Sequence, residues 1–285
     1  RVALTPMISR CVFDAIVNHA YPVDPAREKH YDLVLRYHQL GIPQIEGSLA
    51  VPVIEDICHA FFANPTSFIP EAGKGWAVFS LPKFFGVAGM AGGILVRDKN
   101  EARALRELRD LSESLTDAEQ RCQAEDFHSA YGGDSRSQER LEILYLKRRL
   151  NSLCHPRDLI GFPSCPYELD AIRVRRRQVM QRLLDALDTN MFPPSWHGLL
   201  DSWLPFALPV FLNSEDQMMA ASAALNSMGI QSDVYSIDVA RNHAVPRLRK
   251  AVVIPCHHQL SNRACDAIAS VLRAGDGGVD TSASL

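Results

Sequence analysis

Two stretches decide the fold, VIEDICHAFFA at residues 53–63 and FSLPKFFGVAGMAGGILV at residues 79–96. Both contain short apolar runs that end in polar residues or glycine, a pattern typical of strands buried on both faces. Between such runs lies helical periodicity, as in residues 25–41, where Gly41 is a plausible cap. Short strands alternating with helices predict an α/β fold with a mostly parallel sheet. The predicted strands of this part are residues 11–18, 51–56, 76–80 and 92–96.

Beyond a proline-containing break at residues 155–166, the pattern changes. A long helix is predicted over residues 167–188, followed by a small α+β unit. We therefore expect a large domain over residues 1–166, a connecting helix with a small domain over 167–273, and a flexible tail over 274–285. The predicted elements of the small unit are strands at 204–212, 230–237 and 251–255 and helices at 214–229 and 261–275, the two helices beginning with Ser214 and Ser261.

Composition excludes several classes of protein. Of the 285 residues, 47% are hydrophobic and 22% are charged, which is ample apolar material for a core and argues against disorder. The formal net charge of -3 disfavours general nucleic-acid binding, since proteins that bind phosphate backbones are usually basic. No apolar stretch reaches the roughly 18 residues of a membrane helix. We expect neither a nucleic-acid nor a membrane partner.

The seven cysteines form no CxxC pair and their number is odd. Neither a disulfide framework nor a zinc site is expected from this pattern. Reduced thiols in a cytoplasmic protein without a bound metal are the simplest interpretation.

Three motifs carry chemistry. Asp56 ends a predicted parallel strand, where open α/β sheets bind ligands, although capping the next helix is the more ordinary task for such an aspartate. Lys83 stands between Pro82 and two phenylalanines, and desolvation there would lower its pKa and make it an amine nucleophile, although a surface lysine beside aromatic residues is the plainer alternative. Glycines at 86–93 precede a strand and permit a close backbone approach or a tight hairpin.

The order of Asp56, Lys83 and the glycine pair Gly92-Gly93 along the chain resembles the pattern of fold type I pyridoxal phosphate (PLP) enzymes. More narrowly, it resembles that of the DegT-type nucleotide-sugar aminotransferases. The C-terminal third, with FALPVFLNSEDQMMAASAALNSMGIQSDVYSIDVARN at residues 206–242, looks like the small domain of that family. The family's first hundred or so residues have no counterpart here. We therefore expect the turn that clamps the cofactor phosphate, and the aromatic residue that stacks on its ring, to lie outside the sequence.

The resemblance implies a role for each motif residue. Lys83 would bind PLP covalently and shuttle protons after substrate displaces it. Asp56 would pair with the ring nitrogen, which lets the ring accept electrons. His59 would lie near the ring hydroxyl. Ser80 would bind the cofactor phosphate, although it precedes the lysine by three positions where the family usually has five.

Outside these motifs, three small-domain residues are candidates for substrate contact: Tyr235, Asp238 and Arg241. A polar surface turn is the alternative for them. The arginines among residues 173–177 are interpreted as a solvated helix face.

The leading hypothesis is a PLP-dependent transaminase that converts a nucleotide-linked keto-sugar to an amino-sugar, with glutamate as amino donor and a homodimeric assembly. Two alternatives stay open. One is a PLP enzyme of the same fold with other chemistry. The other is a non-catalytic, dimerising member of the family.

Overall fold

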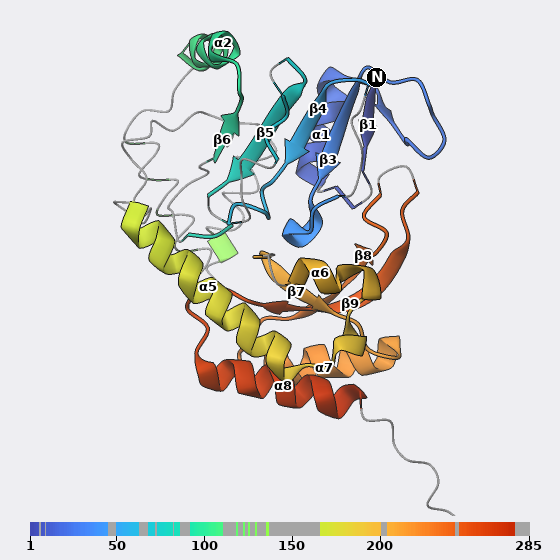
Figure 1. Ribbon diagram of the computed structural model, residues 1–285, viewed down its shortest axis with the longest axis vertical. Coiled ribbons are helices and arrows are strands. Elements are labelled where there is room, and N and C mark those ends of the chain that lie inside the picture. The colour runs from blue at the N-terminus through green and yellow to red at the C-terminus, as the bar shows by residue number, and fades with distance from the viewer. Residues whose placement is uncertain are drawn as a thin grey trace, which may run out of the picture.

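The computed structural model describes residues 1–110 and 166–276, with gaps at 6, 9, 45–49, 63–67, 72, 82, 86–91, 201–203 and 243–244. Between these two parts it describes positions 118, 122, 125, 129, 135 and 136. The described residues form two sheets, one above the other in Figure 1, and a long helix runs from the lower edge of the first sheet past the second. No helix among them is long and apolar enough to span a bilayer.

The first sheet has six strands in the order β2-β1-β3-β4-β5-β6. Neighbours are parallel except β6, which runs antiparallel to β5. This confirms the mostly parallel sheet expected from the sequence. Its strands are β1 (Val2–Leu4), β2 (Pro22–Val23), β3 (Leu33–Tyr37), β4 (Val53–Asp56), β5 (Gly75–Ser80) and β6 (Gly92–Leu95).

Two sequence predictions in this sheet are wrong. Residues 11–18 lie within helix α1 (Arg10–His19), because the parallel neighbours β1 and β2 need a crossover and this apolar run supplies it. The predicted helix at 25–41 contains strand β3 instead, and its Gly41 ends a short 3₁₀ turn, η1 (Gln39–Gly41). Val34 and Leu35 are both buried, as expected of a parallel strand covered on both faces.

The second sheet is antiparallel, in the order β7-β9-β8. Helices α7 and α8 cover one face and contact each other, and the long helix α5 packs on α8 (Figure 1). One core of buried aliphatic side chains and Trp196 joins these helices to the sheet. The elements are β7 (Ala207–Val210), β8 (Asp233–Asp238), β9 (Leu248–Pro255), α5 (Pro166–Ala186), α7 (Glu215–Ser227) and α8 (Asn262–Asp276).

The predicted helix starts in this unit are confirmed. The Ser214 hydroxyl accepts the Gln217 N–H, and the Gln217 side chain accepts the Ser214 N–H, which makes a capping box. The Ser261 hydroxyl accepts the Ala264 N–H at 3.1 Å. Helix α8 continues past residue 274, where the sequence predicts a tail, and residues 277–285 lie outside the described part.

The remaining described elements are short or peripheral. They are α2 (Lys99–Asp110), two 3₁₀ turns, η5 (Thr189–Met191) and η6 (Pro194–Trp196), and α6 (His197–Leu200).

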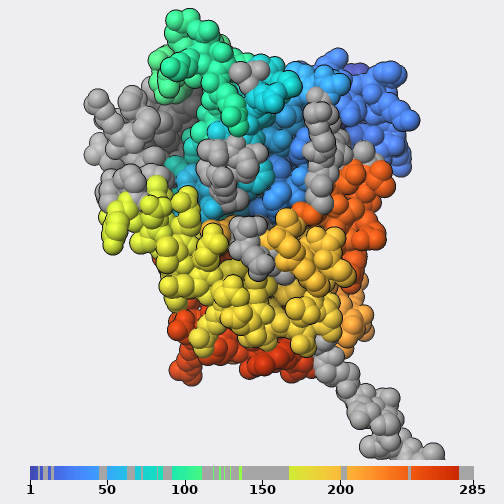
Figure 2. Space-filling view, viewed as in Figure 1, coloured from blue at the N-terminus to red at the C-terminus, as the bar shows by residue number. Residues whose placement is uncertain are grey.

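Contacts between the two sheets come from the segment after β3. The Gln39 side-chain amide donates to the Ser236 carbonyl at 2.8 Å and accepts the Asp238 N–H at 3.2 Å. The guanidinium of Arg241 donates to the Pro43 carbonyl at 3.2 Å. Figure 2 shows the orange part of the small unit directly against the blue part of the first sheet.

A substitution at Gly41 tests how closely the segment after β3 packs on the turn that contains His59. Its φ of +84° is left-handed, and an added Cβ would lie 2.3 Å from the His59 carbonyl oxygen. Gly229 also has a left-handed φ, of +74°, but an added Cβ there meets nothing within 4 Å. We expect Gly229→Ala to lower the free energy of unfolding by about 1–2 kcal/mol, from backbone strain alone.

Gly41→Ala should cost a further ~1–3 kcal/mol because the clash adds to the same strain. Urea unfolding of both variants measures the difference. Equal losses would contradict the close packing of Gly41 on the His59 backbone.

Candidate active site

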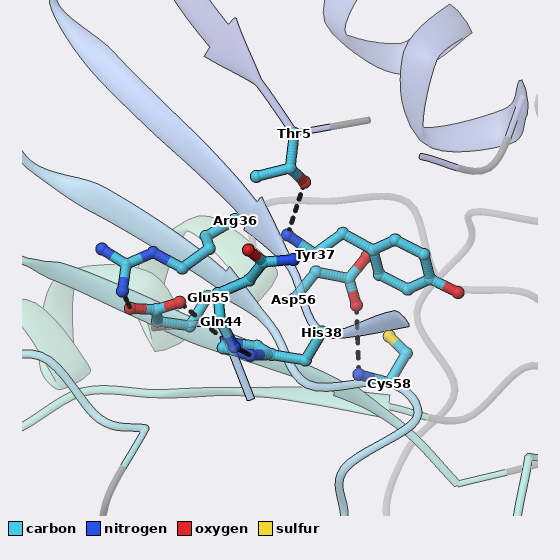
Figure 3. A network of polar contacts seen from close by, with 8 residues as sticks. All are labelled: Thr5, Arg36, Tyr37, His38, Gln44, Glu55, Asp56 and Cys58. Atoms are coloured by element: carbon cyan, nitrogen blue, oxygen red, sulfur yellow. Dashed lines mark hydrogen bonds and ion pairs between the residues drawn. The ribbon is translucent and has the colours of Figure 1, made fainter. Parts of the chain in front are cut away.

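Asp56 lies at the carboxyl end of β4, beside Tyr37 of the parallel strand β3. Its side chain is buried, and Oδ1 accepts the Cys58 N–H at 3.0 Å, which closes the turn after the strand (Figure 3). No described group donates to the other oxygen, Oδ2. Asp56 therefore closes a turn and still has one oxygen for a ligand at the sheet edge.

Glu55 faces away from Asp56, as strand alternation requires. It lies 3.5 Å from the Arg36 guanidinium and 2.9 Å from His38 Nε2 (Figure 3). The Gln44 N–H donates to His38 Nδ1, so the histidine proton is on Nε2 and is donated to Glu55. Glu55 is thus held in a buried network behind the site. The sequence does not indicate this network, because its spacing around His38 predicts a helix.

His59 lies in the turn after β4. Its Nδ1 is 2.8 Å from the Tyr37 hydroxyl and 3.2 Å from the Leu40 N–H. Its ring stacks on Phe206, with 4.6 Å between centroids and 8° between planes. Burial, and then the positive charge of Lys83, lower the pKa of His59 from 6.5 to about 3. His59 is therefore a neutral side chain at physiological pH.

Lys83 lies in the turn after β5, and its Nζ is 5.9 Å from the centroid of the Phe206 ring. Its side chain is exposed, so the prediction that its neighbours desolvate it is wrong. Phe84 and Phe85 point inward into a buried aromatic cluster and leave the amine outside it. Pro82 lies outside the described residues.

Ser80 and the glycine pair lie at the same edge of the sheet. Ser80 ends β5 and pairs with Gly92 of β6. An added Cβ on Gly92 would lie 2.4 Å from the Phe79 carbonyl oxygen, so the close approach of these strands needs glycine there. Because β4 and β5 are parallel, Ser80 and Asp56 mark the carboxyl ends of neighbouring strands.

The small-domain candidates make mainly structural contacts in the described residues. The Asp238 carboxylate accepts three backbone N–H groups, of Ala240, Asn242 and Arg247. Arg241 is buried, with a left-handed φ of +53°, and bonds to Pro43 as described above. Tyr235 is exposed on β8. Substrate contact by these three stays a prediction.

One arginine of the predicted solvated face is buried. Arg176 is 2% exposed, and its guanidinium lies 5.3 Å from the Phe62 ring and 5.1 Å from the Phe84 ring. It also donates to the carbonyls of Pro205 and Phe206. The prediction of a solvated face is therefore wrong for this residue. Arg176 connects Phe84, which follows Lys83, to the segment that contains Phe206.

Comparisons with known proteins bear on the family and the fold of the chain. Residues 2–120 match the model of a family described as "Putative PLP-dependent aminotransferase". No curated protein matches the sequence.

Several solved structures share the fold. A DegT DnrJ EryC1 StrS aminotransferase from Brucella abortus has a TM-score of 0.53 and 14% identity, covering 97% of this chain and 79% of its own. DesV from S. venezuelae has a TM-score of 0.58 and 16% identity, covering 98% and 79%. The sugar aminotransferase CalS13 from Micromonospora echinospora has a TM-score of 0.55 and 16% identity, covering 96% and 80%.

The chain has the PLP fold type I. At the sheet edge of this fold type I chain, the Oδ2 of the buried Asp56, to which no described group donates, suits a protonated ring nitrogen, because a buried carboxylate needs a cationic or donating partner. His59, three residues after Asp56, offers a neutral ring, and Lys83 offers a positive charge close enough to act on that ring. The described residues therefore fit PLP.

The lowered pKa of His59 makes a prediction about acid stability. In the unfolded chain this histidine binds a proton below pH 6.5, whereas in the folded chain it binds one only near pH 3. The unfolded state thus holds more protons between these values, and stability falls as the pH falls. The loss is about 1.4 kcal/mol per pH unit.

Between pH 6.5 and pH 4.5, the free energy of unfolding of the wild type should fall by about 2–3 kcal/mol more than that of His59→Gln, which has no imidazole to titrate. Urea unfolding at the two pH values measures this. Equal acid losses in the His59→Gln variant and the wild type would show that His59 is not held neutral by the fold.

Proposed function

We propose that the protein is a PLP-dependent aminotransferase that converts a keto group of a nucleotide-linked sugar to an amine, with glutamate as the amino donor. The observation that carries this is that Asp56, His59 and Lys83 lie at the carboxyl edge of one fold type I sheet, at the end of β4, in the turn after it and in the turn after β5. The match of residues 2–120 to an aminotransferase family model supports the cofactor and the reaction. The sugar as substrate class is supported by structural neighbours named as sugar aminotransferases.

Bound PLP would supply an electron sink for the bond that breaks at the substrate carbon. Asp56, through Oδ2, would hold a proton on the ring nitrogen and so keep the ring electron-poor. Lys83 would hold the cofactor and, once displaced, move a proton to and from the substrate carbon as general base and acid. Ser80, at the end of β5, would donate a hydrogen bond to the cofactor phosphate.

The exposure of Lys83 fits this proposal, since an amine that must bind one partner and release it to another needs access. The homodimer and the cytoplasmic location stay predictions. So do the substrate contacts of Tyr235, Asp238 and Arg241.

Covalent PLP binding tests the proposal. The purified full chain mixed with PLP should show the visible absorption band of PLP bound through a lysine, and Lys83→Ala should abolish it. Lys74→Ala is the matched control, because Lys74 is also exposed but is ion-paired with Glu71 at 2.7 Å. A band that survives Lys83→Ala would refute the assignment of Lys83.

Glutamate separates the alternatives. Transamination requires glutamate to convert the bound cofactor to its amine form, with loss of the visible band. A lysine-bound band that glutamate leaves unchanged would favour a PLP enzyme with other chemistry. A stable dimer that binds no PLP would favour a non-catalytic member of the family.

A further inference from the structure

The nitrogen Nδ1 of His59 receives two hydrogen bonds from one short segment. Tyr37 ends β3 directly opposite Asp56, so both side chains project from the same face of the sheet. From there the Tyr37 hydroxyl reaches to 2.8 Å from His59 Nδ1. The Leu40 N–H lies 3.2 Å from the same nitrogen.

These contacts define where the ring proton lies. A backbone N–H can only donate, so Nδ1 is an acceptor and carries no proton. The Tyr37 hydroxyl must then donate as well. A neutral imidazole with a bare Nδ1 has its proton on Nε2, and no described residue accepts a hydrogen bond from Nε2.

We propose that Tyr37 is a positioning residue that holds His59 as the neutral Nε2–H tautomer, so that His59 presents a fixed hydrogen-bond donor to the cofactor ring. The part that concerns the cofactor rests on the proposed function. The tautomer itself rests only on contacts within this chain.

Contacts with neighbouring residues fix the positions of Tyr37 and His59 relative to each other. The Thr5 hydroxyl accepts the Tyr37 N–H at 2.8 Å, which fixes the backbone from which the ring extends (Figure 3). Leu40 has a left-handed φ of +53°, and its N–H donates to His59 Nδ1. Stacking on Phe206 fixes the plane of the His59 ring.

The neutral tautomer also suits the charge of the site. Lys83 already contributes a positive charge that acts on His59. A second cation beside it would repel the amine, whereas a neutral Nε2–H donates a hydrogen bond without adding charge. The site thus contains a hydrogen-bond donor that does not repel the positive charge of the lysine.

Nitrogen-15 NMR of histidine-labelled full chain, recorded without PLP, tests the tautomer directly. We expect a protonated Nε2 and an unprotonated Nδ1 for His59 at pH 7. Tyr37→Phe should shift the Nδ1 resonance because it removes one donor, and Tyr21→Phe, at an exposed tyrosine, should not. Thermal unfolding of each variant checks that it is folded.

PLP titration gives the second measurement. Tyr37→Phe should weaken PLP binding by about tenfold, the scale of one hydrogen bond that orients a donor. Tyr21→Phe should bind as the wild type does.

A proton on Nδ1 of wild-type His59 would overturn the tautomer, and an unchanged Nδ1 resonance in folded Tyr37→Phe would overturn the role of Tyr37 in holding it. Wild-type PLP affinity in Tyr37→Phe would overturn the link to the cofactor. A wild-type chain that binds no PLP would refute the proposed function, and with it the cofactor part, while the spectrum would still decide the tautomer.

Discussion

The pairing of β3 with β4 is the constraint on which the site depends. Its register places Tyr37 opposite Asp56 and Arg36 opposite Glu55. Because side chains alternate along a strand, a slip by one residue would exchange the two faces. If Glu55 were opposite Tyr37, it would take the place at the sheet edge, and Asp56 would lie opposite His38, on the face of the buried network. One register therefore separates the carboxylate of the buried network from the carboxylate that is left for a ligand.

The segment that follows β3 extends this constraint to the second sheet. Gln39 is bonded to both Ser236 and Asp238, and the Leu40 carbonyl accepts the Phe206 N–H at 3.0 Å. Phe206 in turn covers the ring of His59. The site is thus completed by a residue that leads into the small sheet, and its geometry depends on how the two sheets meet.

Short apolar runs were enough to predict β4, β5 and β6, and with them the placement of Asp56 and Ser80 at one edge. The run around Val34 and Leu35 was misread because its spacing also fits a helix, and only burial on both faces distinguishes the two. The exposure of Lys83 depends on which way Phe84 and its neighbour turn, which sequence spacing does not encode. Tyr37 gave no signal, because its contact with His59 arises only when β3 and β4 lie side by side.

The most direct test of the central claim is the protonation of the cofactor ring. PLP labelled with nitrogen-15 at the ring position, bound to the full chain at neutral pH, reports by its chemical shift whether that nitrogen carries a proton. We predict a protonated nitrogen in the wild type, because Oδ2 of Asp56, to which no described group donates, stabilises the charge, and an unprotonated one in Asp56→Asn. An unprotonated ring in the wild type, or the same shift in both proteins, would contradict the account.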